Sequence, residues 1–250
     1  MIKGLISEID HFAIHDGRGI RTIIFFSGCP LKCMWCHSPE LQSPVPLLLR
    51  TGDRCLNCGF CTESCPERLT ASKYKFYEES GGGVTISGGE ALAQPAFLKA
   101  LVDRLHSEGI SIVVETSGFG DTDTVRAIAQ KAELFFDIKC MDGKKHVKYT
   151  GVSNELIHRN LRAARDVSDK IVIRFPLIPG CNDDDDNVLQ TFGLAKQLGL
   201  SVQLLRYNEA APEKYRWIDR DYGLKTAKRQ DEGHIERVMA LVPKDLDVTV

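Results

Sequence analysis

The chain has no apolar run close to the roughly 20 residues that a membrane-spanning helix needs. Its N-terminus, Met-Ile-Lys-Gly-Leu-Ile-Ser-Glu, includes an acidic residue where a secretory signal is apolar. It also has no excess of basic residues, because 32 Lys and Arg stand against 34 Asp and Glu in 250 residues. These absences argue against membrane insertion, secretion and phosphate-mediated binding of nucleic acid. We therefore expect a cytoplasmic protein that has neither a membrane nor a nucleic acid as its partner.

Cysteine, in contrast, is abundant. Of nine cysteines, seven fall into two closely spaced groups, whereas Cys140 and Cys181 stand alone. Close spacing of this kind is typical of thiolate ligands of a metal and not of disulfides that join distant loops. We interpret Cys140 and Cys181 as ordinary buried or loop thiols. The seven are Cys29, Cys33, Cys36, Cys55, Cys58, Cys61 and Cys65.

From Thr22 onward, short runs rich in β-branched residues alternate with longer amphipathic stretches. This alternation is typical of strand–helix units with a parallel sheet. The sequence therefore predicts an α/β fold, an open, partial (β/α)6 barrel with its functional loops after the strand C-termini. The expected strands are 21–26, 84–87, 111–115, 134–138, 170–175 and 201–206, with a weaker one at 246–250. The expected helices are 95–108, 123–132, 154–167 and 186–198.

One stretch interrupts this rhythm. Residues 41–83 contain four cysteines and run to three consecutive glycines, so we interpret them as an insertion. The barrel would then comprise residues 1–40 and 84–250. The acidic run 183–186 is interpreted as the solvated N-terminus of a helix.

The first cysteine group, Cys29, Cys33 and Cys36, has the spacing C-x3-C-x2-C and follows the first strong strand. A 4Fe–4S cluster has four irons, so three protein thiolates leave one iron open for a substrate or cofactor. The alternative is a structural zinc site with His37 as fourth ligand. Adjacent Cys36 and His37 are poorly placed to reach one tetrahedral ion together.

The second group has the C-x2-C-x2-C-x3-C-P spacing of bacterial ferredoxins. It predicts one auxiliary 4Fe–4S cluster on Cys55, Cys58, Cys61 and Cys65, with zinc as the less favoured alternative. Such a cluster either relays an electron to the catalytic cluster or orders the insertion and shapes a docking face. The sequence leaves this choice open.

Together with the cysteine triad, several further segments resemble a family, the activating enzymes of glycyl radical enzymes, which belong to the radical S-adenosylmethionine (SAM) superfamily. The resemblance covers nearly the whole chain outside the insertion. Members with ferredoxin-like insertions usually carry two four-cysteine runs, so the single run here is a departure. The matching segments are 16–40, 80–91, 115–119, 137–139, 150–154, 173–180 and 183–186.

The resemblance implies a reaction. The open iron binds SAM, one electron splits a carbon–sulfur bond, and the 5′-deoxyadenosyl radical removes hydrogen from a backbone glycine in the glycine loop of a partner glycyl radical enzyme. The products are methionine and 5′-deoxyadenosine. Reduced flavodoxin or ferredoxin would supply the electron. The resemblance further implies a monomeric enzyme of anaerobic metabolism.

The resemblance also implies site residues. It assigns a monovalent cation to Glu115, Thr116 and Asp137, and contact with the partner enzyme to Asp16. Two positions depart from the family, since Glu115 replaces an aspartate and Asn208 a histidine, so the cation site would be altered and the adenine contact would come from an amide. The residues implied to bind SAM are Trp35, His37, Gly88, Gly89, Glu90, Ser117, Asp137, Ile138, Lys139, Arg174 and Asn208.

Structural alternatives exist for two of these motifs. Gly88-Gly89 is also compatible with a simple strand-end turn. Asp137 and Lys139 lie two apart, so both side chains should face the barrel interior, where Asp137 would otherwise form a salt bridge with Lys139 or Arg174.

Two other functions compete with the activating enzyme. A ferredoxin-like electron carrier explains the second cysteine group but leaves the three-cysteine site without a purpose. A radical SAM enzyme that acts on a small molecule would share the SAM machinery. The near-complete match to the activating enzymes, including Asp16, favours activation of a partner enzyme.

Overall fold

The computed structural model describes residues 2–45, 77 and 79–250, and within them one sheet contains eight strands in sequence order. The first strand pairs antiparallel with the second, and every later pair is parallel. No pairing between the first and last strands is present in this sheet order, so the predicted open, partial barrel is confirmed. The strands are β1 (Ile6–Ala13), β2 (Arg21–Phe26), β3 (Gly83–Gly88), β4 (Ser111–Thr116), β5 (Glu133–Asp137), β6 (Ile171–Pro176), β7 (Ser201–Leu205) and β8 (Val248–Thr249).

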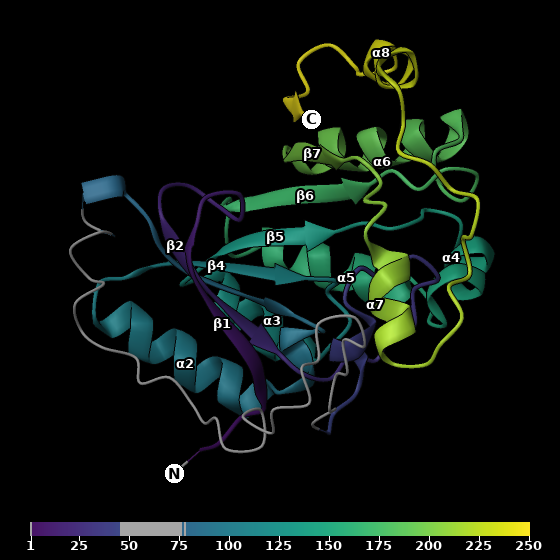
Figure 1. Ribbon diagram of the computed structural model, residues 1–250. Coiled ribbons are helices and arrows are strands. Elements are labelled where there is room, and N and C mark those ends of the chain that lie inside the picture. Colours follow the sequence, from purple (N-terminus) through teal and green to yellow (C-terminus); the bar gives the residue numbers. More distant parts are fainter. Residues whose placement is uncertain (1, 46–76, 78) are drawn as a thin grey trace.

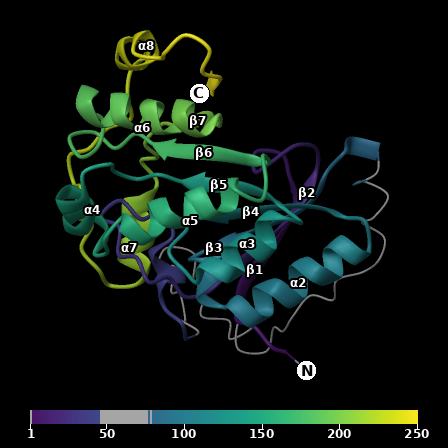
Figure 2. The same ribbon diagram turned by 180° about the vertical axis from the view of Figure 1, so that it is seen from behind.

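Helices cover one face of the sheet, as the two opposite views show (Figures 1 and 2). The covering helices are α2 (Pro95–Ser107), α3 (Thr122–Ala129), α5 (Glu155–Arg165) and α6 (Asp185–Leu198). The other helical elements are η1 (Pro39–Gln42), η5 (Ala91–Ala93), α4 (Gly143–Thr150), α7 (Ala211–Trp217) and α8 (Glu232–Ala240). Among the described residues, none of the helices has the length and apolar character to cross a membrane.

The alternation of side chains along the strands separates the core from the site. Ile86, Val114 and Phe136 are fully buried and belong to the main hydrophobic cluster, which includes residues of the covering helices. The next residues, among them Glu115 and Asp137, point to the opposite face because successive strand side chains alternate. The apolar face thus holds the helices, and the inner face is free to carry polar groups at the strand ends.

Most of the predicted helices and strands lie at the predicted residues. Strand 21–26 coincides with β2, and the other five predicted barrel strands and four helices match within a few residues. The prediction missed β1, α4, α7 and α8, which are polar or short. It placed the start of the barrel strand after the insertion at residue 84, one residue later than the observed start of β3. Most of the predicted insertion lies outside the described residues, so the domain boundaries remain a prediction.

A buried amide holds the loop that follows β4. Asn160 of α5 is fully buried. Its Nδ2 donates to the carbonyls of Gly118 at 2.7 Å and Gly120 at 2.8 Å. Its Oδ1 accepts from the hydroxyl of Thr122 at 2.6 Å. The loop therefore takes its shape from a residue of α5 that lies 40 positions later in the chain than Gly120.

We expect Asn160→Ala to lower the free energy of unfolding by about 2 kcal/mol, because it leaves two buried carbonyls without a donor. Urea unfolding of the apo-protein, followed by circular dichroism, measures the change. Arg159→Ala, at the exposed neighbouring position of the same helix, serves as the control and should change it little. Equal losses in the two variants would contradict the role given to Asn160.

Candidate functional site

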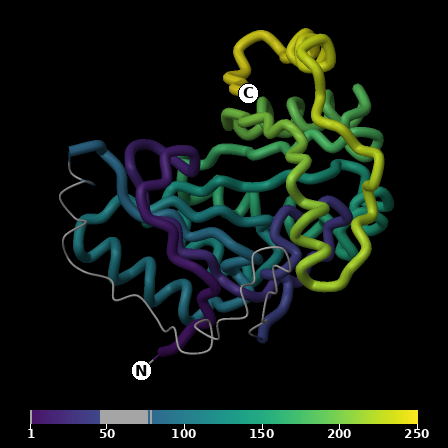
Figure 3. The backbone as a smooth tube through the Cα atoms, viewed as in Figure 1, coloured from purple at the N-terminus to yellow at the C-terminus, as the bar shows by residue number. Residues whose placement is uncertain are grey.

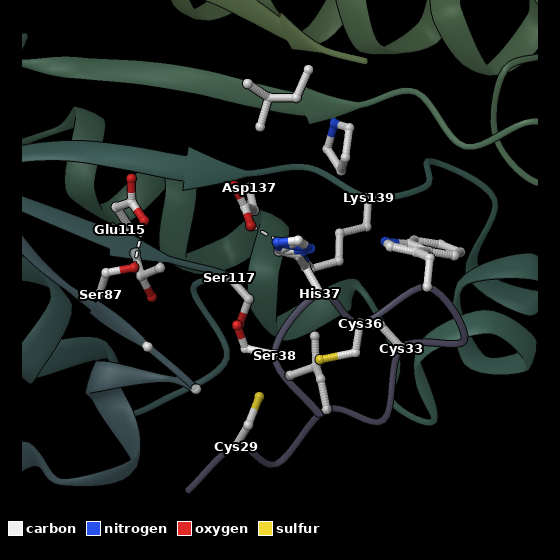
Figure 4. A pocket seen from close by; sticks show the side chains of 17 residues that line it. Cys29, Cys33, Cys36, His37, Ser38, Ser87, Glu115, Ser117, Asp137 and Lys139 are labelled. Carbon is white, nitrogen blue, oxygen red and sulfur yellow. Dashed lines mark hydrogen bonds and ion pairs between the residues drawn. The ribbon is translucent and has the colours of Figure 1, made fainter. Parts of the chain in front are cut away.

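A pocket of about 250 Å³ lies at the C-terminal ends of the parallel strands (Figure 4). One side is the loop after β2, which contributes all three cysteines of the first group. A second side is the glycine turn that ends β3. The ends of β4 to β7 complete the lining with polar side chains and with Pro176 and Leu205. This is the edge where open α/β sheets bind ligands.

Backbone hydrogen bonds fix the cysteine loop from two directions. The amide of Gly28 donates to the carbonyl of Leu41 at 2.8 Å, which closes the loop on itself. From the other direction, the carbonyls at the end of α4 accept from the loop, Thr150 from Lys32 at 2.8 Å and Tyr149 from Met34 at 2.9 Å. The loop therefore presents its thiols from a rigid frame.

The three thiols fit the ligand set of an iron–sulfur cluster. Cys29, Cys33 and Cys36 are free, half-buried and all line the pocket. Burial raises the pKa of Cys29 to about 12 and that of Cys33 to about 11, and it also raises the pKa of Cys36. Buried thiolates are thus unfavourable here without a positive partner such as iron.

The turn that ends β3 requires glycine at two positions. Gly88 has φ of 115°, and a Cβ there would lie 2.3 Å from the carbonyl oxygen of Phe26. A Cβ on Gly89 would lie 2.5 Å from the carbonyl oxygen of Gly28. Gly88 and Gly89 therefore form a strand-end turn and at the same time bring backbone to the pocket wall, and their contact with SAM stays a prediction.

Glu90 has a different place from the one expected. Its side chain is buried and does not line the pocket. Oε1 accepts from the amide of Leu92 at 3.0 Å and from the hydroxyl of Thr116 at 2.6 Å, and Oε2 accepts from the amide of Ser117 at 2.8 Å and from its hydroxyl. Burial raises the pKa of Glu90. Because these four donors saturate the carboxylate, Glu90 positions Thr116 and Ser117, which do line the pocket.

Asp137 and Lys139 share the inner face, as their spacing predicts, and both line the pocket. Oδ2 of Asp137 lies 2.8 Å from Nζ of Lys139, so the salt bridge considered as a structural alternative is present (Figure 4). Burial by itself lowers the pKa of Lys139, but the carboxylate of Asp137 raises it above its ordinary value. Lys139 therefore places a permanent positive charge in the pocket wall.

A second ion pair joins Glu115 to Arg174. Glu115 lines the pocket and accepts from the hydroxyl of Ser87 at 2.5 Å, and Nη1 of Arg174 contacts its other oxygen. Burial by itself lowers the pKa of Arg174, but Glu115, Asp137 and Asp16 raise it above its ordinary value. The carboxylates of Glu115 and Asp137 are thus both paired with side-chain cations, and as they stand they do not fit a monovalent cation.

Arg174 contacts Glu115 but does not itself line the pocket, and three further predicted residues lie elsewhere. Ile138 is 1% exposed within the main hydrophobic cluster, and its amide donates to the carbonyl of Arg174. Asn208 is exposed after β7, where it lines a neighbouring hollow and accepts from the amide of Ala210. Asp16 is half-buried, and its carbonyl accepts from the hydroxyl of Thr85. The four cysteines of the second group lie outside the described residues.

The sequence interpretation missed several lining residues. Three of them occupy inward-facing positions at or next to the ends of β3, β6 and β7, as Glu115 does on β4: Ser87, Pro176 and Leu205. The period-two alternation that placed Asp137 would have found them. Leu31 and Ser38, on the cysteine loop, complete the missed set.

Comparisons with known proteins agree with this site. A family described as a 4Fe-4S single cluster domain matches residues 15–149. The trans-4-hydroxy-L-proline dehydratase activating enzyme of Clostridioides difficile is 33% identical over 95% of this chain and 95% of its own length. The isethionate sulfite-lyase activating enzyme of Nitratidesulfovibrio vulgaris is 34% identical over 87% of this chain and 88% of its own length.

A solved structure gives the same result. A domain of a pyruvate-formate lyase-activating enzyme from Bacteroides vulgatus is 28% identical, with a TM-score of 0.56 over 68% of this chain and 98% of that chain. SuiB of Streptococcus suis, solved with S-adenosylmethionine, is 14% identical and shares the fold, with a TM-score of 0.60 over 91% of this chain and 51% of that chain.

The open parallel sheet and the three-cysteine pocket at its strand ends define a radical SAM enzyme, an oxidoreductase class that uses a 4Fe–4S cluster and SAM. Within this class, the chain belongs to the activating enzymes of glycyl radical enzymes.

We expect Glu90→Gln to weaken SAM binding and to lower the free energy of unfolding by about 2 kcal/mol, because the amide nitrogen would face donors that now meet an acceptor. Urea unfolding and calorimetric titration with SAM measure the two effects. Glu155→Gln, the same change at an exposed position, should affect neither. Unchanged SAM affinity in Glu90→Gln would refute the positioning role.

Proposed function

We propose that this chain generates a radical on a backbone glycine in the glycine loop of a partner enzyme, in the cytoplasm and as a monomer. SAM and one electron from reduced flavodoxin or ferredoxin would be consumed, and methionine and 5′-deoxyadenosine would be formed. The observation that supports it most is that one pocket is lined by three free thiols, by the close-packed turn at Gly88 and Gly89, and by Lys139 in its ion pair.

A 4Fe–4S cluster on Cys29, Cys33 and Cys36, when bound with SAM, supplies reductive cleavage of a carbon–sulfur bond. The chain itself contributes binding and orientation. The ammonium group of Lys139 attracts a carboxylate. The hydroxyls of Thr116 and Ser117 donate their hydrogens to Glu90, so their oxygens are oriented to accept from the amino group of SAM.

The aromatic wall offers contacts for the rest of the ligand. Trp35 lines the pocket and provides an apolar surface against which adenine can stack. His37 also lines it, and burial together with the charge of Lys214 lowers its pKa, which favours the neutral imidazole. A neutral His37 hydrogen-bonds adenine without repelling the sulfonium of SAM.

The partner is proposed as a glycyl radical enzyme without a particular name. The relatives are activating enzymes for unlike partners, including a dehydratase, a sulfite-lyase, a choline trimethylamine-lyase and benzylsuccinate synthase. Their identities to this chain lie between 31% and 34%. These identities are too similar to one another to indicate which of the four partner enzymes, if any, corresponds to the partner of this chain.

We also propose one auxiliary 4Fe–4S cluster on Cys55, Cys58, Cys61 and Cys65. Its support is the ferredoxin-type spacing alone, because these residues lie outside the described part of the chain. An accessory role in electron relay or docking fits, since the pocket already contains the complete three-cysteine set.

Anaerobic reconstitution with iron and sulfide tests both clusters, and about eight irons per chain are expected. The triple variant C29A/C33A/C36A should keep about four irons and lose 5′-deoxyadenosine formation. The variant C55A/C58A/C61A/C65A should also keep about four irons but retain SAM cleavage under a strong reductant. A glycyl radical signal in the partner, read by electron paramagnetic resonance, completes the test. No cleavage by the reconstituted wild type would refute the proposed function.

The monovalent cation is replaced, in our proposal, by Arg174 and Lys139, which already neutralise Glu115 and Asp137. We expect SAM cleavage at the same rate in potassium, sodium and choline buffers of equal ionic strength. Arg174→Gln, which leaves Glu115 without its partner, should make the rate depend on the cation. Strong stimulation of the wild type by potassium would show that a cation displaces the pair.

A further inference from the structure

The cysteine loop lies between two segments that are far apart in the sequence. On one side, the end of α4 binds it through the carbonyls of Tyr149 and Thr150. On the other, a Cβ on Gly223 would lie 3.4 Å from Cε of Met34, and Leu224 and Ala227 pack against the same second hydrophobic cluster as the loop. Figure 3 traces the chain from β2 into this loop, beside α4 and α7.

The outer surface of this arrangement is basic. Lys32 of the loop, Lys148 of α4 and Lys228 of the C-terminal segment are exposed, and we call these three residues the basic rim. A Cβ on Gly151, next to α4, would lie 3.9 Å from Cβ of Lys32, so the loop and the helix end form one continuous surface. Lys148 is 5.4 Å from the ring centroid of Tyr149.

One carboxylate lies beside the rim, since Glu209 accepts from the amide of Arg229, next to Lys228, at 2.7 Å. Other acidic groups nearby have partners outside the rim. Asp184 pairs with Lys145 at 3.0 Å, and Asp221 pairs with Lys225 at 3.2 Å. Asp142 caps the N-terminus of α4, at the end away from the cysteine loop. Within the described residues, no carboxylate forms an ion pair with a residue of the basic rim. The positive charge therefore faces solvent.

None of the three residues of the basic rim lines the pocket. The thiols line the pocket, which SAM and the partner's glycine loop would occupy. Lys32, between Cys29 and Cys33, is exposed and does not line the pocket. An electron donor on the rim would thus approach the cluster without displacing either substrate.

We propose that the basic rim is the docking surface for the reductant, an acidic protein that carries a single electron. This inference rests on the proposed function, since it concerns the same cluster. The reduced carrier loses one electron and the catalytic cluster gains it. Complementary charge speeds the encounter and suits a transient interface that must release the oxidised carrier.

The test uses the reconstituted enzyme and a reduced flavodoxin of net negative charge. The double variant K148E/K228E should be reduced about tenfold more slowly, with a weaker dependence on ionic strength. Stopped-flow bleaching of the cluster absorbance measures the rate. The matched control K99E/K170E changes the net charge equally at two exposed positions off the basic rim and should behave as the wild type.

Photoreduction with deazaflavin bypasses docking, so 5′-deoxyadenosine formation by K148E/K228E should then equal that of the wild type. The neutral variant K148Q/K228Q should be reduced by flavodoxin at an intermediate rate. This control separates an effect of charge from a folding defect. An unchanged rate of reduction of K148E/K228E by flavodoxin would overturn the proposed docking surface. An equal loss of rate in K99E/K170E would overturn it as well. Failure of the wild type to cleave SAM under photoreduction would instead overturn the proposed function.

Discussion

Close contact between two backbone turns is the constraint on which the site depends. The turn at Gly88 and Gly89 lies against the carbonyls of Phe26 and Gly28, at distances that leave no room for a Cβ. The amide of Glu90 also donates to the carbonyl of Gly28 at 2.9 Å. Since Gly28 immediately precedes the first cysteine, the position of the thiols relative to the strand ends is fixed by this packing.

Charge inside the barrel is the second organising feature. A carboxylate that leaves water is costly unless it is paired, and the inner face of the sheet carries Glu115 and Asp137. Their cations come from different distances in the chain, since Lys139 is two residues from Asp137 and Arg174 is 59 residues from Glu115. Pairing makes the wall nearly neutral and yet rich in hydrogen-bonding groups, which suits a zwitterionic ligand with a sulfonium.

The sequence predicted the elements that repeat and missed those that do not. Strands such as β2 contain short runs of β-branched and aromatic residues that are buried along most of their length, and such runs are easily found. β1 is an antiparallel edge strand with two register shifts and no regular alternation of polar and apolar residues, and α4 and α7 are short and charged, so periodicity gave no signal. Contacts between distant segments, such as the four hydrogen bonds of Glu90, were equally out of reach, because spacing along one chain does not reveal which loops meet.

The missed elements hold and cover the cysteine loop. Lys214 of α7 contacts Glu40 at 2.9 Å, just after the cysteine loop. α4, on the opposite side, holds the loop through two carbonyls. A loop held only by the sheet would have to carry the cluster and form an outer surface with the same few residues. Because α4 and the C-terminal segment supply that outer surface, the residues that carry its charge are separate from the pocket-facing thiols, glycines and ion pairs.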